Sequence, residues 1–139
     1  MSKTEKYIEY HPNGNKKEEG TYKDGKKDGL WTQWWKNGQK YREWTYKNGI
    51  KDSKWTNWYD NGQKCSEVTY KYGEWDGLFA HWHFNGWKKW EGTYKDGEKE
   101  GLWTVRYENG QKEDEKTYKD GKLISSKCWD EDGNEKECD

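Results

Sequence analysis

Apolar and polar positions recur along this chain with one fixed period, and they do not follow the spacing of an amphipathic helix. The clearest example runs from Leu30 to Ser53, where aromatic residues alternate with polar ones between glycine-containing turns. Self-similarity at a fixed period indicates a repeat protein, whose units pack against their neighbours. Two glycine series mark the period: Gly14, Gly38, Gly62, Gly86 and Gly110, and Gly25, Gly49, Gly73, Gly97 and Gly121.

The period divides the chain into five complete repeats and one shortened repeat. The complete units are residues 6–29, 30–53, 54–77, 78–101 and 102–125. Residues 126–139 resemble the first half of a sixth unit that lacks one residue, with Asp132-Gly133 as its turn. We therefore predict a single repeat domain over residues 1–139, closed by a C-terminal cap.

Two turn signals in most units predict two strands per unit. Asn-Gly and Asp-Gly are strong hairpin signals, because a type I′ turn needs positive φ at both central residues. The sequence therefore predicts an all-β fold: an elongated, single-layer antiparallel meander of β-hairpins with about eleven strands. At about 4.8 Å per strand, each unit lengthens the sheet by about 10 Å.

Two-residue turns also predict which side chains share a face, because opposed residues of an antiparallel pair point the same way. Around Asn37-Gly38 this pairing places Trp34 opposite Tyr41. It places Gly29 opposite Tyr46, so that a tyrosine ring can cover a backbone without a side chain. The predicted core face carries Gly20, Tyr22, Gly29, Trp31, Trp35, Trp44 and Tyr46.

The opposite face, here called the Thr/Glu face, carries one threonine and one glutamate series. Trp34 and Trp35 are successive on a strand, so they cannot both enter one core. The Thr/Glu face therefore carries the aromatic row, our candidate partner surface, which consists of Tyr10, Trp34, Trp58, Trp82 and, at its end, Arg106. Two interpretations stay open: the rings stabilise the sheet by lying against lysine stems and neighbours such as Tyr41, or they form a docking stripe.

Composition predicts an aromatic core. Leu, Ile, Val and Phe together number only 11, which by itself is typical of disorder. However, 12 Trp and 11 Tyr residues supply apolar area, and the net charge of −1 does not hold the chain open. The balanced charge argues against nucleic-acid binding, which needs a basic stripe. The first residues lack the apolar segment of a signal peptide, so a cytoplasmic location is expected.

The few candidates for special chemistry have plainer interpretations. His81 and His83 share a strand face and could hold a metal ion, but His83 occupies the position of Trp35 in its own repeat, which favours an aromatic filler. The glutamates form a ladder rather than one special pair, so no enzyme activity, cofactor or metal is expected. Cys128 and Cys138 flank the last turn, where they are either free thiols or a disulfide, which would need a bulge or an oxidising compartment.

The repeated phrases W-T-x-W-[WY]-x-N-G-Q-K and E-x-T-Y-K-[DN]-G resemble the variant MORN repeat of YwqK-type bacterial proteins. The resemblance covers most of the chain. It implies one hairpin per repeat and an interaction role, which in proteins of this kind is often that of an antitoxin in a toxin–antitoxin pair. Ser53, Ser125 and Tyr72 depart from the repeated pattern.

These observations predict a non-enzymatic repeat scaffold that binds a protein partner. Two alternatives use the aromatic row differently, to bind membrane lipids or to bind glycans of a cell wall. The balanced charge disfavours anionic lipid surfaces, and the expected location disfavours cell-wall glycans. Self-association is expected to use the N-terminal edge strand near Tyr7 to Tyr10, because open strand edges pair with other chains.

Overall fold

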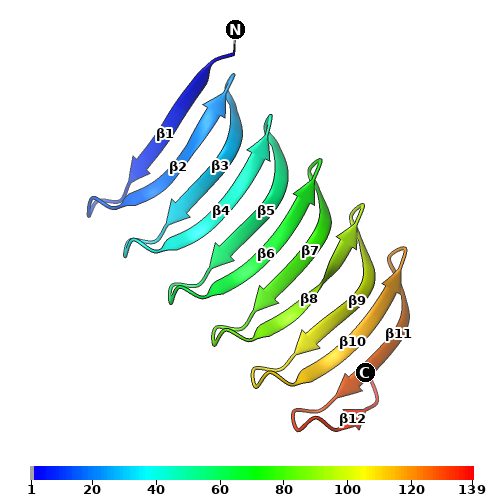
Figure 1. Ribbon diagram of the computed structural model, residues 1–139. Coiled ribbons are helices and arrows are strands. Elements are labelled where there is room, and N and C mark those ends of the chain that lie inside the picture. The colour runs from blue at the N-terminus through cyan, green and yellow to red at the C-terminus, as the bar shows by residue number, and fades with distance from the viewer. Residues whose placement is uncertain (1) are drawn as a thin grey trace.

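The computed structural model describes residues 2–139, which form one open β-sheet (Figure 1). Twelve antiparallel strands follow one another in chain order, each hydrogen-bonded to the next. The predicted all-β meander is therefore confirmed, with a short twelfth strand beyond the eleven expected. The strands are β1 (Thr4–Tyr10), β2 (Lys16–Lys23), β3 (Lys26–Trp34), β4 (Lys40–Lys47), β5 (Ile50–Trp58), β6 (Lys64–Lys71), β7 (Glu74–Trp82), β8 (Lys88–Lys95), β9 (Glu98–Arg106), β10 (Lys112–Lys119), β11 (Lys122–Trp129) and β12 (Glu135–Lys136).

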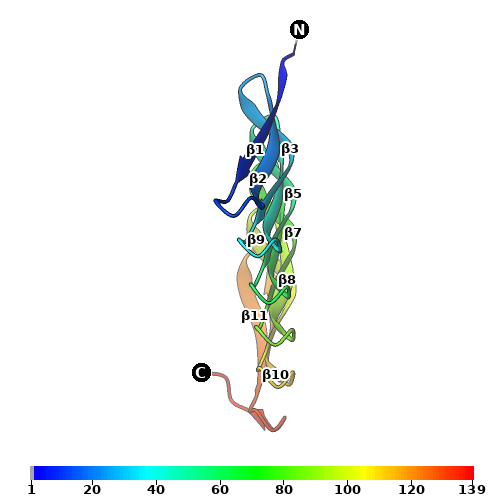
Figure 2. The same ribbon diagram turned by 90° about the vertical axis from the view of Figure 1, so that its left-hand side faces the viewer.

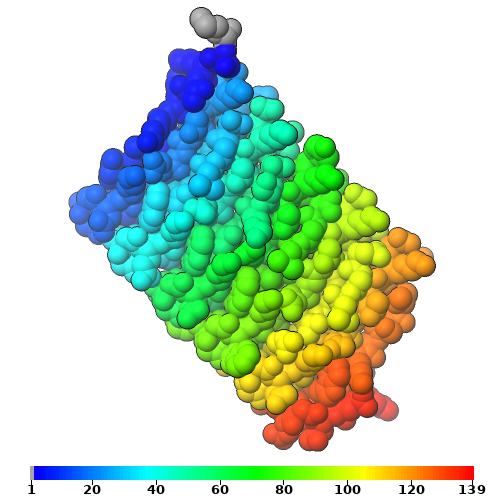
Figure 3. Space-filling model, viewed as in Figure 1, coloured from blue at the N-terminus to red at the C-terminus, as the bar shows by residue number. Residues whose placement is uncertain are grey.

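The sheet is a single twisted layer. Turned by 90°, the molecule is thin, and its two termini lie at opposite ends (Figure 2). The space-filling view shows the repeats as successive bands across the face, in sequence order (Figure 3). Within residues 2–139, no segment folds back to cover either face of the sheet.

The turns after the even-numbered strands are the predicted type I′ turns. Asp24 and Gly25 have φ values of 50° and 80°, so both central residues are left-handed. The strands on either side pair without interruption, with Lys23 opposite Lys26 and Tyr22 opposite Lys27. Tyr72 adopts the same left-handed backbone, with φ 52°, at the one such turn that lacks Asn or Asp.

The Asn-Gly turns after the odd-numbered strands are not type I′, which corrects the prediction. Gly38 has φ 89°, but Asn37 is not left-handed. Gly38 N–H donates to the carbonyl of Trp35 (3.0 Å), and Trp35 N–H donates to the carbonyl of Gln39 (2.8 Å). This is a three-residue loop, a type I turn followed by a left-handed glycine. The side chain of Asn37 favours it by accepting a bond from Gln39 N–H (2.9 Å).

The extra loop residue changes the register at the strand ends only. Trp31 still lies opposite Trp44, as predicted. Beyond a bulge at Gln33/Trp34, however, Trp34 lies opposite Lys40 and not opposite Tyr41. Tyr41 packs instead against the ring of Trp35, with 4.4 Å between ring centroids.

The core is a ridge of stacked rings on the predicted core face. Trp31, Trp44 and Trp103 are buried, and Trp31 has no exposed surface. The rings of Trp31 and Trp44 lie 6.4 Å apart, and those of Trp44 and Trp55 lie 5.9 Å apart. The indole N–H of Trp31 donates to the carbonyl of Thr21 (3.2 Å), which satisfies its polar atom within the ridge.

Glycines make room for this ridge, but Gly29, which the sequence indicated as lying beneath a tyrosine ring, is not one of them. A Cβ atom at Gly29 would meet nothing within 4 Å, so Tyr46 does not cover it. Gly29 instead has φ 73° beside the register shift between β2 and β3. The glycine that lies under a ring is Gly20, where a Cβ atom would overlap the indole of Trp31.

Candidate functional site

The aromatic row lies on the Thr/Glu face, where each tryptophan meets a lysine from the preceding hairpin. The ammonium of Lys16 lies 5.8 Å from the ring of Trp34, and that of Lys40 lies 5.7 Å from the ring of Trp58. Lys64 and Trp82 repeat the contact at 5.7 Å. Cations at these distances attract the ring faces, so these contacts stabilise the row whether or not a partner binds.

The two ends of the row differ from its middle. Trp34, Trp58 and Trp82 are half-buried, whereas Tyr10 is 57% exposed. Arg106 turns back to its own loop, where its guanidinium donates to the carbonyl of Gly110 (3.2 Å). The structure therefore places all five predicted residues on successive hairpins, but only the tryptophans share the lysine contact.

The sequence analysis missed Trp129, which continues the row after Arg106. Lys112 lies 5.8 Å from its ring, the same arrangement as in the earlier repeats. The last repeat lacks one residue, so Trp129 is displaced from the strict series of the other repeats. Aligning residues 126–139 with the other repeats after a shift of one position places Trp129 in the row.

The glutamate series neutralises the same lysines. Lys64 forms ion pairs with Glu67 (2.9 Å), as Lys16 does with Glu19 (2.8 Å). The hydrogen bond from Lys16 holds the pKa of Glu19 below its usual range. Burial acts to raise the pKa of Glu67, but Lys64 and Lys54 outweigh it and the pKa is lowered. These carboxylates are therefore held ionised as partners of lysines.

A second row on the Thr/Glu face is exposed. Leu30, Leu78 and Leu102 take the same place in their repeats and are 57%, 42% and 55% exposed. They lie opposite threonines of that face, as Leu30 does opposite Thr45. We call these three residues the leucine row. Apolar side chains that are repeatedly left in water indicate a contact surface.

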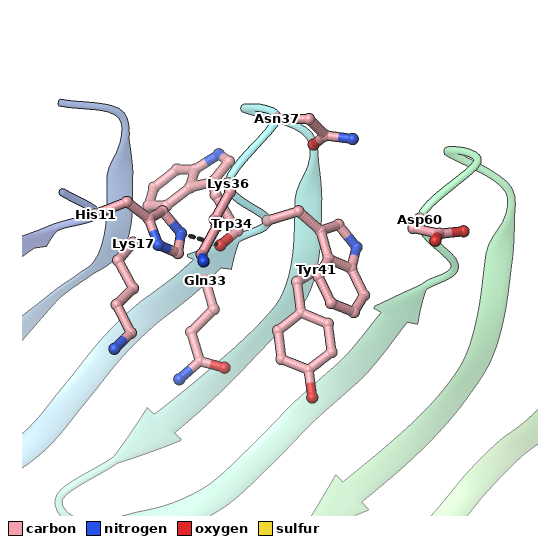
Figure 4. A pocket seen from close by; sticks show the side chains of 9 residues that line it. His11, Lys17, Gln33, Trp34, Lys36, Asn37, Tyr41 and Asp60 are labelled. Carbon is pink, nitrogen blue, oxygen red and sulfur yellow. Dashed lines mark hydrogen bonds between the residues drawn. The ribbon is translucent and has the colours of Figure 1, made fainter. Parts of the chain in front are cut away.

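The core face has a different feature at the Asn-Gly ends of the strands. Pocket A, with a volume of about 530 Å³, is lined by nine residues that include His11, Trp35, Tyr41 and Asp60. Figure 4 shows the ring of Tyr41 in this pocket and Asp60 on the neighbouring loop. Pocket B, of about 430 Å³, is its counterpart one repeat later and shares Trp35, Tyr41 and Asp60 with it.

Side chains at the ends of the odd-numbered strands connect each hairpin to the next. His11 bonds to the carbonyl of Trp34 (2.9 Å, dashed in Figure 4), and Tyr59 donates to the carbonyl of Trp82 (2.6 Å). Tyr107 makes the same bond to Trp129 (2.8 Å). Trp35 interrupts the series, because its buried indole N–H has no partner in the described part of the chain. Its ring forms the wall between pockets A and B.

His81 and His83 have separate partners. His81 stacks on Trp90, with ring centroids 5.3 Å apart, and burial lowers its pKa. His83 bonds to the carbonyl of Arg106 (2.9 Å). Within residues 2–139, no three side chains of His, Cys, Asp or Glu come together as a metal site.

Cys128 and Cys138 are joined by a disulfide, with their Cα atoms 5.3 Å apart. The three-residue loop places Lys136 opposite Cys128, in place of the Glu137 that a two-residue turn would give. The bridge fastens the C-terminus to β11, because β12 itself pairs with only two residues of that strand.

Comparisons with known proteins agree with the hairpin repeat. The family described as MORN repeat variant matches residues 6–24, 27–48, 51–72 and 99–120, which is more than half of the chain. Each matched segment spans one hairpin: β1–β2, β3–β4, β5–β6 and β9–β10. A comparison with curated proteins found no match. No helix within residues 2–139 is long and apolar enough to cross a membrane.

Proposed function

The chain belongs to the MORN repeat variant family, and from this premise we propose that it is a non-enzymatic scaffold that binds a protein partner. The leucine row carries the proposal. A single-layer sheet is rigidified by its neighbouring repeats, and its exposed leucines take equivalent positions on one face in the second, fourth and fifth repeats, with Lys54 at that position in the third. A partner that buries them would gain about 25 cal/mol for each Å² of apolar surface removed from water.

In this proposal the aromatic row borders the leucine row and contributes to the same interface. Its tryptophans are half-buried, so they can offer part of each ring to a partner while the lysines cover the remainder. Aromatic residues with this combination of rigid and exposed surface dominate the energy of many interfaces. The partner surface is therefore the Thr/Glu face from Tyr10 to Trp129.

Affinity capture with matched variants tests the proposal. The intact chain, immobilised, should retain one protein from a lysate of its source cells in stoichiometric amount. Leu30→Ser with Leu102→Ser should abolish the retention, and Trp34→Ala with Trp58→Ala should weaken it. Leu123→Ser changes a side chain that is equally exposed, at 52%, but lies outside the row, so it should have no effect.

The outcomes are distinguished by melting temperature. Loss of retention in the leucine variant at an unchanged melting temperature supports the proposal. Retention that survives in the leucine variant, or no retained protein with the intact chain, would rule it out. If the Trp34/Trp58 variant unfolds, the aromatic row is structural and the leucine row alone remains as the interface.

The YwqK-type resemblance extends the proposal to an antitoxin that acts in the cytoplasm on a toxin. A captured partner should then arrest growth when expressed alone, and co-expression of the intact chain should restore growth. The Cys128–Cys138 disulfide is the observation that opposes this location, because disulfides persist mainly in oxidising compartments. Thiol labelling in intact cells decides this: labelling of Cys128 and Cys138 together with the free Cys65 fits the cytoplasm, and labelling of Cys65 alone excludes it.

A further inference from the structure

Pockets A and B lie at the Asn-Gly ends of the strands; their linings include Trp34 and Trp58 of the aromatic row but no residue of the leucine row, which carries the function proposed above. Trp35, Tyr41 and Asp60 belong to both pockets, so the two hollows are adjacent. They are one repeat apart, and one repeat contains two strands. Because strands lie about 4.8 Å apart, the pockets are spaced by about 10 Å across the strands.

A peptide that runs across the strands can place side chains in both pockets only if its side chains repeat at this spacing. One backbone conformation meets that condition. A polyproline II helix has three residues per turn and rises about 3.1 Å per residue, so equivalent side chains recur at intervals of about 9 Å. Side chains on one face of an extended strand recur at intervals of about 6.6 Å, which misses the second pocket. Grooves lined by aromatic rings are the usual binding sites of polyproline II segments.

Most of the uncharged polar side chains at these loops are already engaged, the indole N–H of Trp35 excepted. His11 and Tyr59 bond to backbone carbonyls, and Asn13 and Asn61 donate their side-chain amides to the next loop. A sugar needs many free hydrogen-bonding partners. Proline has no backbone N–H and needs fewer. The pockets therefore suit a proline-rich peptide better than a glycan.

Charge identifies the peptide further. Lys17 and Lys36 line pocket A and Arg42 lines pocket B, whereas Asp60 is the single carboxylate of either pocket. Lys36 forms no ion pair within residues 2–139. We propose that pockets A and B bind an acidic, proline-rich segment of a protein partner in the polyproline II conformation, with residues three apart in the two pockets.

Synthetic peptides test the class of ligand on the intact chain. The probe is Pro-Pro-Glu repeated four times, and binding is measured by calorimetry. Pro-Pro-Lys repeated four times keeps the conformation and reverses the charge. Gly-Gly-Glu repeated four times keeps the charge and loses the conformation. We expect each control to bind at least about tenfold more weakly than the probe, a difference of about 1.4 kcal/mol.

Asp60→Phe fills the pockets with a side chain that the next repeat already carries at the equivalent position. Phe84 is the counterpart of Asp60 in the next repeat, and its ring lies 5.2 Å from that of Tyr59. Asp60→Phe should therefore place a ring against Trp35 and weaken the probe at least about tenfold. Removing the negative charge of Asp60 would by itself strengthen binding of the acidic probe. Filling of the pockets and loss of the charge therefore predict opposite changes in affinity.

Two further variants complete the test. Glu108→Phe makes the same substitution two repeats later, away from pockets A and B, and should leave binding unchanged. Lys36→Glu should weaken Pro-Pro-Glu and strengthen Pro-Pro-Lys. Equal binding of the three peptides, an equal loss in Asp60→Phe and Glu108→Phe, or binding of chitin oligosaccharides in their place would overturn the inference. None of these results bears on capture through the leucine row.

Discussion

At the scale of residues, two glycines allow a one-layer sheet to bury whole tryptophan rings. Gly20 and Gly92 are buried beneath the indoles of Trp31 and Trp103, which lie flat on backbone that has no side chain. A tryptophan that is buried in this way removes about 150–250 Å² from water. The second and third repeats fill the same position with Trp44 and Val68, and the ring of Trp55 is tilted by 43° against that of Trp44.

Gly92→Ala should destabilise the protein because the added Cβ atom overlaps the ring of Trp103. The ring must move away from the sheet, and overpacking of this kind costs about 1–3 kcal/mol. Lys116→Ala alters the same position in the next repeat and is the matched control. Chemical denaturation measures both, and equal stability of the two variants would show that the ring does not depend on this glycine.

The buried Glu67 should make stability depend on acid pH. Its folded pKa is lowered by Lys64 and Lys54 against the opposing effect of burial. A carboxylate with a lowered folded pKa stabilises the fold above its unfolded pKa, about 4.3, and this stabilisation is lost as the pH falls through the folded value. The wild type should therefore exceed Glu67→Gln in unfolding free energy at neutral pH. A gap that does not shrink below a pH of about 4.3 would contradict this assignment.

At the scale of elements, the hairpins alternate between two kinds of loop. Two-residue turns follow the even-numbered strands, and three-residue loops follow the odd-numbered strands. The first kind requires two left-handed residues, which Asn, Asp and Gly tolerate. Tyr72 does not suit this conformation, and its side chain is 83% exposed without compensating burial.

Tyr72→Asn should therefore stabilise the protein by about 1 kcal/mol, since it relieves a bulky residue in the left-handed region. Asn48→Tyr makes the reverse change at the equivalent turn and should destabilise by a similar amount. Thermal unfolding with calorimetry measures both effects. An unchanged stability for both would mean that the turn backbone adapts to either residue at no cost.

Periodicity predicted the strands because glycine and tyrosine positions repeat without insertion, and it placed Trp34 and Trp35 on opposite faces correctly. It did not predict the loop type, because Asn-Gly is compatible with both a type I′ turn and a three-residue loop that Asn37 caps through its side chain. That error moved Tyr41 to the wrong neighbour. For the same reason the sequence did not predict pockets A and B, since both are lined by Tyr41 and Trp35, whose rings are in contact.

At the scale of the whole molecule, the sheet has two unprotected edges. Among residues 2–139, no strand lies on the outer side of β1, which exposes Ile8 and Tyr10. β12 pairs with only Cys128 and Trp129, so most of the outer edge of β11 is also open. The charged C-terminal segment therefore covers little of that edge.

We expect self-association at high concentration through antiparallel pairing of two β1 strands, which closes a symmetric dimer. Ile8→Lys should abolish the dimer in sedimentation equilibrium, because a charge on an edge strand opposes pairing. Ile124→Lys places the same charge on β11 and should leave it intact. A dimer that persists after deletion of residues 1–11 would assign the contact to another surface.

This chain forms one open layer with both faces available to partners, and small-angle X-ray scattering of the monomer distinguishes such a layer from a compact fold. Twelve strands at about 4.8 Å give a sheet about 50 Å long, about 28 Å across and about 10 Å thick, with a radius of gyration of about 17 Å. A compact chain of this length has a radius of gyration of about 14 Å. The larger value, with an elongated distance distribution, supports the open sheet, and the compact value contradicts it.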